Sequence, residues 1–104
     1  MRYQEERTIY MIKPEYLLED MVRALRKLGF SPALEERGEG WLIEASKSGR
    51  YVKASLRSEK RVLPGLEVFG LVPISHLRVE AEGPEGFVQE LRRRLEIELL
   101  RCLG

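Results

Sequence analysis

The chain has 104 residues, of which 34% are charged, and its formal net charge is +1 at pH 7. This length suits a single core, so we predict one domain over residues 1–104. The near-neutral balance excludes any argument from overall charge for nucleic acid or an anionic membrane as a partner. A core this small is marginal by itself, and dimerisation is an ordinary way to bury more surface.

The residue types narrow the chemistry further. Glutamate and arginine supply most of the charge, whereas histidine, aspartate, threonine and cysteine occur once each and asparagine is absent. With so few catalytic parts, we predict no catalytic residue, no metal site and no cofactor. The lone Cys102 excludes an intramolecular disulfide and a cysteine-based zinc site. Abundant Glu and Arg with few labile amides indicate a thermophilic source, although a GC-rich genome would give part of the same bias.

Membrane and secretion signals are not found in the sequence. No apolar run approaches the length of a membrane span, and the first six residues do not resemble a signal peptide. We therefore expect a cytoplasmic protein that does not use a membrane.

The first predicted elements are a strand and a helix. Thr8–Ile12 is a run of β-branched, aromatic and large apolar residues, which predicts a buried strand. Lys13 and Pro14 end it, because proline has no N–H for a β-ladder and its fixed φ suits the start of a helix. A helix is predicted over residues 14–28, because apolar residues recur at helical spacing, acidic residues come first and basic residues last, and Gly29 follows at the end.

A longer motif spans this strand and helix. Residues 6–15 have the sequence Glu-Arg-Thr-Ile-Tyr-Met-Ile-Lys-Pro-Glu, and residues 27–30 are Lys-Leu-Gly-Phe. Residues 6–30 resemble the first strand and helix of nucleoside diphosphate kinases, which typically have E-R-T, three variable residues and I-K-P-D, then a K-G-F ending after the helix. The resemblance implies a ferredoxin-like start to the fold and a phosphate contact at Lys13. It covers roughly the first quarter of the chain.

The resemblance does not extend to the catalytic centre of that family. Its phosphate-accepting histidine lies in an N-x-x-H-G-S motif, whereas His76 follows Pro-Ile-Ser and precedes Leu-Arg. The chain is also short for the nucleotide-binding insertion of the family. Kinase activity is therefore not implied. By itself, His76 indicates a loop or core-edge histidine rather than a catalyst.

The middle of the chain predicts antiparallel strands. Residues 33–36 and 41–45 flank a glycine-bearing turn and predict a hairpin. Residues 51–57 alternate, with apolar side chains inward at the even positions, as in a strand with one solvated face. Residues 58–65 predict a charged loop, and the apolar run 66–72 predicts an extended segment.

Two further elements follow. Leu77–Glu82 alternates like a strand, and residues 73–76 form either a tight link before it or the middle of one bent strand. Gly83-Pro84-Glu85 then repeats the helix-start pattern. An apolar stripe at helical spacing follows, consisting of Val88, Leu91, Leu95, Leu99 and Cys102.

The element order is therefore β-α-β-β-β-β-α. Strands between two helices favour an α+β two-layer sandwich, ferredoxin-like in character, with an antiparallel sheet of about 4–6 strands and both helices on one face.

Two regions are candidate binding sites. Lys13 would lie beside the free N–H groups of a helix N-terminus, which favours a phosphate or carboxylate; alternatively, it points to solvent or pairs with a glutamate. The region 47–61 has six cations against one acid, Glu59. It predicts a nucleic-acid-binding face, or alternatively a solvated surface paired with glutamates of a neighbouring strand. Its candidate residues are Tyr51, Lys53, Arg57, Lys60 and Arg61.

From the sequence we favour a non-enzymatic binding or regulatory domain that self-associates as a homodimer. One alternative is a nucleic-acid-binding module that uses the basic region 47–61. The other is a nucleotide- or phosphate-binding relative of nucleoside diphosphate kinases, with Lys13 contacting the anionic ligand.

Overall fold

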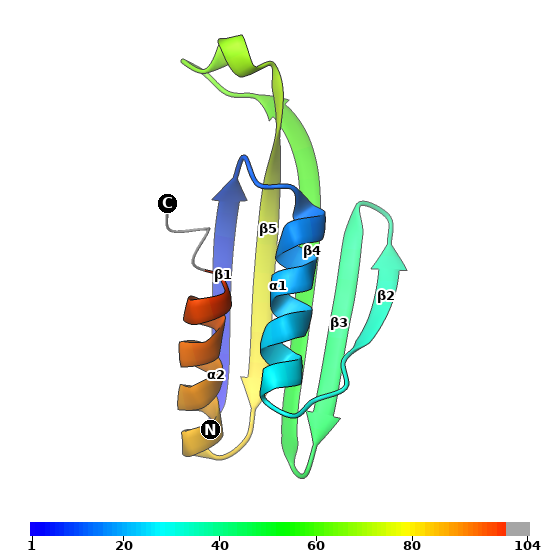
Figure 1. Ribbon diagram of the computed structural model, residues 1–104, viewed down its shortest axis with the longest axis vertical. Helices are drawn as coiled ribbons and strands as arrows, with labels where there is room; N and C mark the ends of the chain where they lie inside the picture. Colours follow the sequence, from blue (N-terminus) through cyan, green and yellow to red (C-terminus); the bar gives the residue numbers. More distant parts are fainter. Residues whose placement is uncertain (100–104) are drawn as a thin grey trace.

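In the computed structural model, residues 1–99 are described, and they form a sheet, two α-helices and a short 3-10 turn. Figure 1 shows their arrangement. In chain order the elements are β1 (Arg2–Tyr10), α1 (Pro14–Lys27), β2 (Ala33–Arg37), β3 (Gly40–Lys47), β4 (Arg50–Val62), η1 (Glu67–Phe69), β5 (Leu71–Glu82) and α2 (Glu85–Glu98).

The described strands form one antiparallel sheet in the order β1-β5-β4-β3-β2. Both helices lie on one face of this sheet, with α2 in front of β1 and α1 in front of β5 and β4 (Figure 1). The predicted α+β class and the antiparallel sheet are confirmed. The strand order does not confirm a ferredoxin-like character, which stays a prediction.

The helix α1 forms where its sequence signals predicted. Pro14 occupies the first turn with Glu15, and Arg26 and Lys27 lie in the last turn, so that side-chain charge complements the helix dipole at both ends. Gly29 follows the helix with a φ of +90°, the left-handed conformation that glycine adopts at little cost. The helix ends one residue before the predicted boundary.

The core lies between the two helices and the face of the sheet that they cover. The even positions of β4 face the helices, as the alternation in residues 51–57 predicted. The predicted stripe of α2 also faces the core, although its last member, Cys102, lies outside the described residues. The core includes Leu17, Met21, Leu25, Val88, Leu91 and Leu95 from the helices and Ile43, Val52, Ala54, Leu56, Leu77, Val79 and Ala81 from the sheet.

The strand β1 differs from the prediction in extent and position. It begins well before the apolar run, and it lies at an edge of the sheet with β5 as its one neighbour among the described strands. On its helix side, Tyr3 and Arg7 both donate hydrogen bonds to the carboxylate of Glu5. Only Ile9 of this strand is buried. A strand with charged side chains on both faces has no apolar alternation from which it could be predicted.

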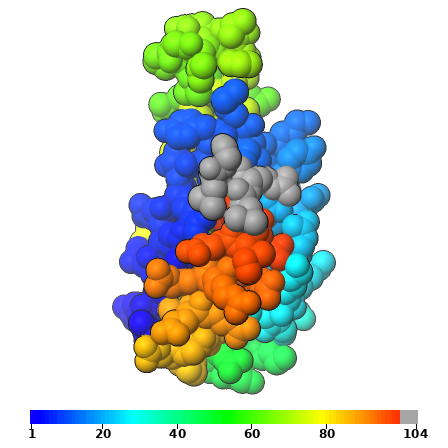
Figure 2. Space-filling model, turned by 60° about the vertical axis from the view of Figure 1, so that its left-hand side comes forward, coloured from blue at the N-terminus to red at the C-terminus, as the bar shows by residue number. Residues whose placement is uncertain are grey.

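Beyond their neighbours, β4 and β5 continue as a two-stranded arm formed by residues 59–73. The strand β3 pairs with β4 only as far as Arg57, and β1 pairs with β5 only as far as Ile74. Past these points the two strands pair with each other. The backbone N–H of Met11 donates to the carbonyl oxygen of Pro73 at 2.8 Å, at the base of the arm. The arm projects from the body along the long axis of the molecule (Figures 1 and 2).

The arm corrects three sequence predictions. Ser58–Val62 belong to β4 rather than to a charged loop, and Leu66–Phe69 form the turn rather than an extended segment. Residues 73–76 are the middle of one continuous strand, the second of the two alternatives, so His76 lies within β5 and not in a turn. The reason is that the side chains of β4 in the arm are largely exposed, so β4 needs no apolar alternation there. Gly70, with a φ of +66°, ends the turn inside the apolar run.

Gly40 allows β3 to lie close to β4. A Cβ atom at this position would lie 1.8 Å from the carbonyl oxygen of Leu56. Because that oxygen belongs to the backbone, no side-chain rotation relieves the overlap, and one of the strands would have to move.

We expect Gly40→Ala to lower the free energy of unfolding by at least about 2 kcal/mol, the cost of forcing a methyl group into a closely packed site. Gly86→Ala is the control, because a Cβ atom there meets nothing within 4 Å. Alanine in this helical position should leave stability unchanged or raise it by about 0.5–1 kcal/mol. Urea denaturation followed by circular dichroism measures both variants. Equal stability of the two variants would contradict the close contact at Gly40.

Candidate functional site

Four of the five predicted nucleic-acid-binding residues share the open face of the sheet, the face opposite the helices. Tyr51, Lys53, Arg57 and Arg61 occupy odd positions of β4, whose even positions face the core. Lys60 occupies an even position in the arm and therefore faces the other way.

Most charged groups on the open face have acidic neighbours. The Nε atom of Arg61 lies 3.1 Å from Oε1 of Glu59. In the strand register, Lys53 lies between Glu44 of β3 and Glu80 of β5. These neighbours match the alternative of a solvated surface in which strand cations face glutamates.

Tyr51 is held beside one of these glutamates. Its hydroxyl group donates to Oε2 of Glu44 at 3.3 Å. Partial desolvation, together with the nearby carboxylate, raises the pKa of Tyr51. Tyr51 is 38% exposed, so part of the residue is accessible to solvent.

One row across the open face contains no acidic residue. From β1 to β2, the successive cross-strand neighbours are Thr8, His76, Arg57, Gly40 and Arg37. Arg37 also pairs with Glu35 at 3.0 Å. The side chain of Arg57 forms no hydrogen bond or ion pair with residues 1–99. Sequence reasoning identified Arg57 but missed the rest of this row, because the row depends on strand register.

A shallow hollow of about 440 Å³ adjoins Arg57 on the open face. His76 lies beside it, with Nε2 at 3.4 Å from Oε1 of Glu59, and this contact is the main cause that lowers the pKa of Glu59. Cations and hydroxyl groups together could hold a phosphate-sized anion here. The polar residues that line the hollow are Glu6, Arg7, Thr8, Ser55, Arg57, His76 and Arg78, although the side chain of Arg7 lies on the helix side, where it bonds Glu5.

Lys13 is the residue that precedes α1. It is exposed, and its ammonium group lies 5.9 Å from the centre of the Tyr16 ring. This contact places the cation along the first turn of α1. The phosphate contact that the kinase resemblance implies stays a prediction.

The end of the arm carries an exposed apolar cluster that sequence reasoning did not single out. Val68 is 90% exposed, Leu71 66% and Phe69 58%, and Val62 and Leu66 complete the group, which we call the arm tip. Exposed apolar side chains that gather in this way mark binding surfaces. The available signal was the glycine inside the apolar run 66–72, because glycine there indicates a turn.

The arm tip also carries a negative charge. Glu67, in η1, accepts a hydrogen bond from the backbone N–H of Gly65 at 3.0 Å. Its own backbone N–H and that of Gly65 lower the pKa of Glu67, so the carboxylate is ionised at neutral pH.

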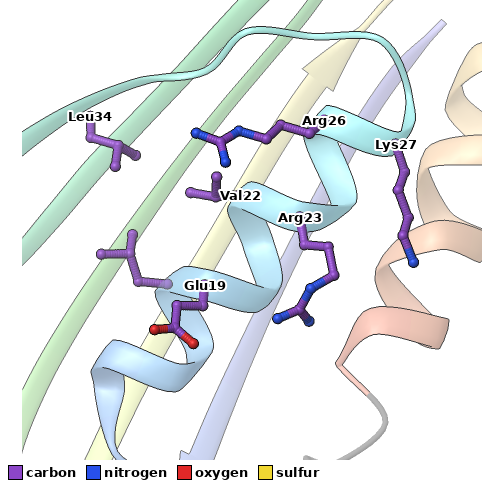
Figure 3. Close-up of a pocket in the computed structure, with 7 residues that line it drawn as sticks. Glu19, Val22, Arg23, Arg26, Lys27 and Leu34 are labelled. Carbon is purple, nitrogen blue, oxygen red and sulfur yellow. The ribbon is translucent and has the colours of Figure 1, made fainter.

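A second uncovered apolar surface, the α1–β2 groove, lies between α1 and β2 (Figure 3). The helices cover β1, β5 and β4 but leave β2 exposed (Figure 1). In Figure 3, Val22 and Arg26 extend from α1 toward Leu34 of β2. The groove has a volume of about 560 Å³ and is lined by Leu18, Glu19, Val22, Arg23, Arg26, Lys27 and Leu34.

Two of the groove cations are held by α2. Lys27 Nζ lies 2.7 Å from Glu98 Oε1, and Arg23 Nη1 lies 3.5 Å from Glu98 Oε2. Arg23 also bonds the buried Asp20, at 3.0 Å. The hydrogen bond from Lys27 is the main cause that lowers the pKa of Glu98. Arg26, in contrast, forms no ion pair within residues 1–99.

Metal ligands, membrane spans and relatives of the chain remain to be described. Among residues 1–99, no three histidine, cysteine or acidic side chains gather as a metal site requires. No helix in the same range is long and apolar enough to cross a membrane. Comparisons of the chain with models of known protein families and with curated protein sequences found no match. Function must therefore be argued from the surfaces of the chain itself.

Glu98→Gln should lower the free energy of unfolding at pH 7 by about 1 kcal/mol, because it removes a charged acceptor that joins the two helices. Folding lowers the pKa of Glu98, so its ionised form stabilises the fold above the unfolded pKa, and that stabilisation is lost as the pH falls through the folded pKa. The difference from wild type should therefore shrink below about pH 4. Denaturation at a series of pH values measures it.

Glu96→Gln is the control, because Glu96 is an exposed acid on the same helix with no ion pair among residues 1–99. A stability difference for Glu98→Gln that does not depend on pH would contradict this role of the carboxylate.

Proposed function

We propose that this chain is a non-enzymatic binding domain that self-associates as a homodimer through its arm. The observation that carries the proposal is the arm tip, a group of apolar side chains exposed at the end of a projecting hairpin.

The hydrogen bonding of the arm supports this use. Val62 and Leu71 are cross-strand partners at the end of the β4–β5 ladder. The backbone N–H groups of Phe69 and Gly70 bond the carbonyl oxygens of Leu66 and Glu67 at 3.0 and 2.9 Å. The apolar side chains are therefore presented by an ordered backbone, so association costs less conformational entropy than ordering a flexible loop would.

The apolar area also supplies a driving force. Removing apolar surface from water contributes about 25 cal/mol per Å². A chain of 104 residues has a small core of its own, so covering an additional apolar surface would be a substantial gain.

We expect the wild type to sediment as a dimer and the variant that combines Val68→Glu with Phe69→Ser to sediment as a monomer. The two substitutions place a charge and a polar group at exposed positions, so they should weaken association at least about 100-fold and leave the fold intact. Sedimentation velocity over a range of concentrations measures the oligomer, and far-ultraviolet circular dichroism checks the fold.

Ile97→Glu is the matched control, since Ile97 is an exposed apolar residue on α2, 41% accessible and outside the arm. This variant should remain a dimer. A wild-type chain that stays monomeric at every concentration would refute the proposal.

A second candidate function is the binding of single-stranded nucleic acid to the open face. The specific observation in its favour is the acid-free row, where Arg57 has no partner among the described side chains. Phosphate contacts from Arg57 and Lys53, with base stacking on Tyr51, would combine the two interactions that proteins use to bind single strands without strong sequence preference.

For this candidate, Arg57→Ala should weaken the binding of a short single-stranded oligonucleotide about tenfold at low salt and reduce the salt dependence by about one phosphate contact. Lys60→Ala is the control, because it removes a cation from the same strand but from the opposite face. Fluorescence anisotropy measures both. Equal losses for the two variants, or no binding by the wild type at low salt, would count against the open face.

A further inference from the structure

We infer that the arm tip of one copy docks in the α1–β2 groove of a second copy, so that a twofold dimer forms by exchange of arms. This inference rests on the proposed function, because it names the surface that the arm tip meets.

The two surfaces match in chemistry. The arm tip presents Val68 and Phe69, and the groove offers Leu18, Val22 and Leu34. The groove volume of about 560 Å³ falls within the roughly 300–1,000 Å³ of pockets that hold compact ligands. Docking would therefore remove from water two apolar surfaces that a single chain leaves exposed.

The two surfaces also match in charge. The arm tip carries the carboxylate of Glu67, which is not engaged in an ion pair within residues 1–99. The groove has an excess of cations, and Arg26 extends toward Leu34 without an acidic partner among the described residues (Figure 3). An ion pair between Glu67 of one copy and Arg26 of the other would fix the position of the tip in the groove.

The shape of the molecule requires a second copy. The arm leaves the body at the end where α1 begins, whereas Arg26 and Lys27 of the groove lie near the other end of α1 (Figure 1). A chain therefore cannot fill its own groove. When two copies lie side by side with their long axes antiparallel, each arm tip comes beside the end of its partner where α1 ends.

Twofold symmetry would also stop the assembly at two. Each copy contributes one arm tip and one groove, and reciprocal docking uses both, so no further copy can join. If copies instead docked head to tail, the copy at one end would keep a free arm tip and the assembly could grow.

The test is complementation between two variants. The tip variant is Val68→Glu with Phe69→Ser, and the groove variant is Leu34→Glu, at a position that is 51% exposed and so tolerates the change without unfolding. Each variant should be monomeric alone. An equimolar mixture should associate more tightly than either variant alone and more weakly than wild type, because the mixed dimer keeps one of the two contacts: the tip of the groove variant in the groove of the tip variant. Sedimentation velocity detects the dimer, and native mass spectrometry identifies it as the mixed species.

A charge exchange tests the position of the tip. Arg26→Glu and Glu67→Arg should each weaken the wild-type dimer about tenfold, and the two changes in one chain should restore the dissociation constant to within about threefold. Because both residues are exposed, these variants keep the fold.

The outcomes separate the inference from the proposed function. If the tip variant is monomeric but the groove variant dimerises as tightly as wild type, the arm remains the interface and the inference that it docks in the groove is overturned. A mixture that associates no more tightly than the separate variants, at the highest concentration measured, would also overturn it. If the tip variant itself remains a dimer, the proposed use of the arm and the inference both fail.

Discussion

A mismatch in length between helices and strands governs this structure. The helices α1 and α2 have 14 residues each, so each is about 21 Å long at 1.5 Å per residue. The strand β4 has 13 residues and spans about 43 Å at 3.3 Å per residue. The helices can therefore cover only about half of β4 and β5 along their length. The core cluster lies in that half, and beyond it β4 and β5 continue as a hairpin whose facing backbone groups bond each other.

The same mismatch, together with the number of strands, separates the candidate surfaces in space. Two helices cover β1, β5 and β4, so the sheet continues past α1 and leaves the groove beside β2 (Figure 1). The groove lies on the helix side, whereas Tyr51, Lys53 and Arg57 lie on the opposite side. Self-association through the arm would therefore leave the open face accessible, and the two proposed functions do not compete for one surface.

The sequence carried enough information for the elements whose residues act locally. Backbone geometry explains the start of α1 at Pro14 and the left-handed Gly29 after its end. Burial of one face of β4 explains the alternation of residues 51–57. The acid-free row could not be predicted, because it brings together Thr8 and Arg37 through a register that no single strand specifies. The arm was missed because charge at positions 59–61 is typical of loops and also of strands that have solvent on both faces.

The two strands of the arm have a consequence for aggregation. A projecting hairpin with an apolar end and unpaired outer edges is a template on which other strands could add. Here the edge of β4 carries Glu59, Lys60 and Arg61 in succession, and the edge of β5 carries Pro73, which has no N–H to offer an incoming strand. These residues thus disfavour strand addition along the edges of the arm, while the arm tip remains able to bind a partner. The hairpin can then be apolar at its end while its edges disfavour the addition of further strands.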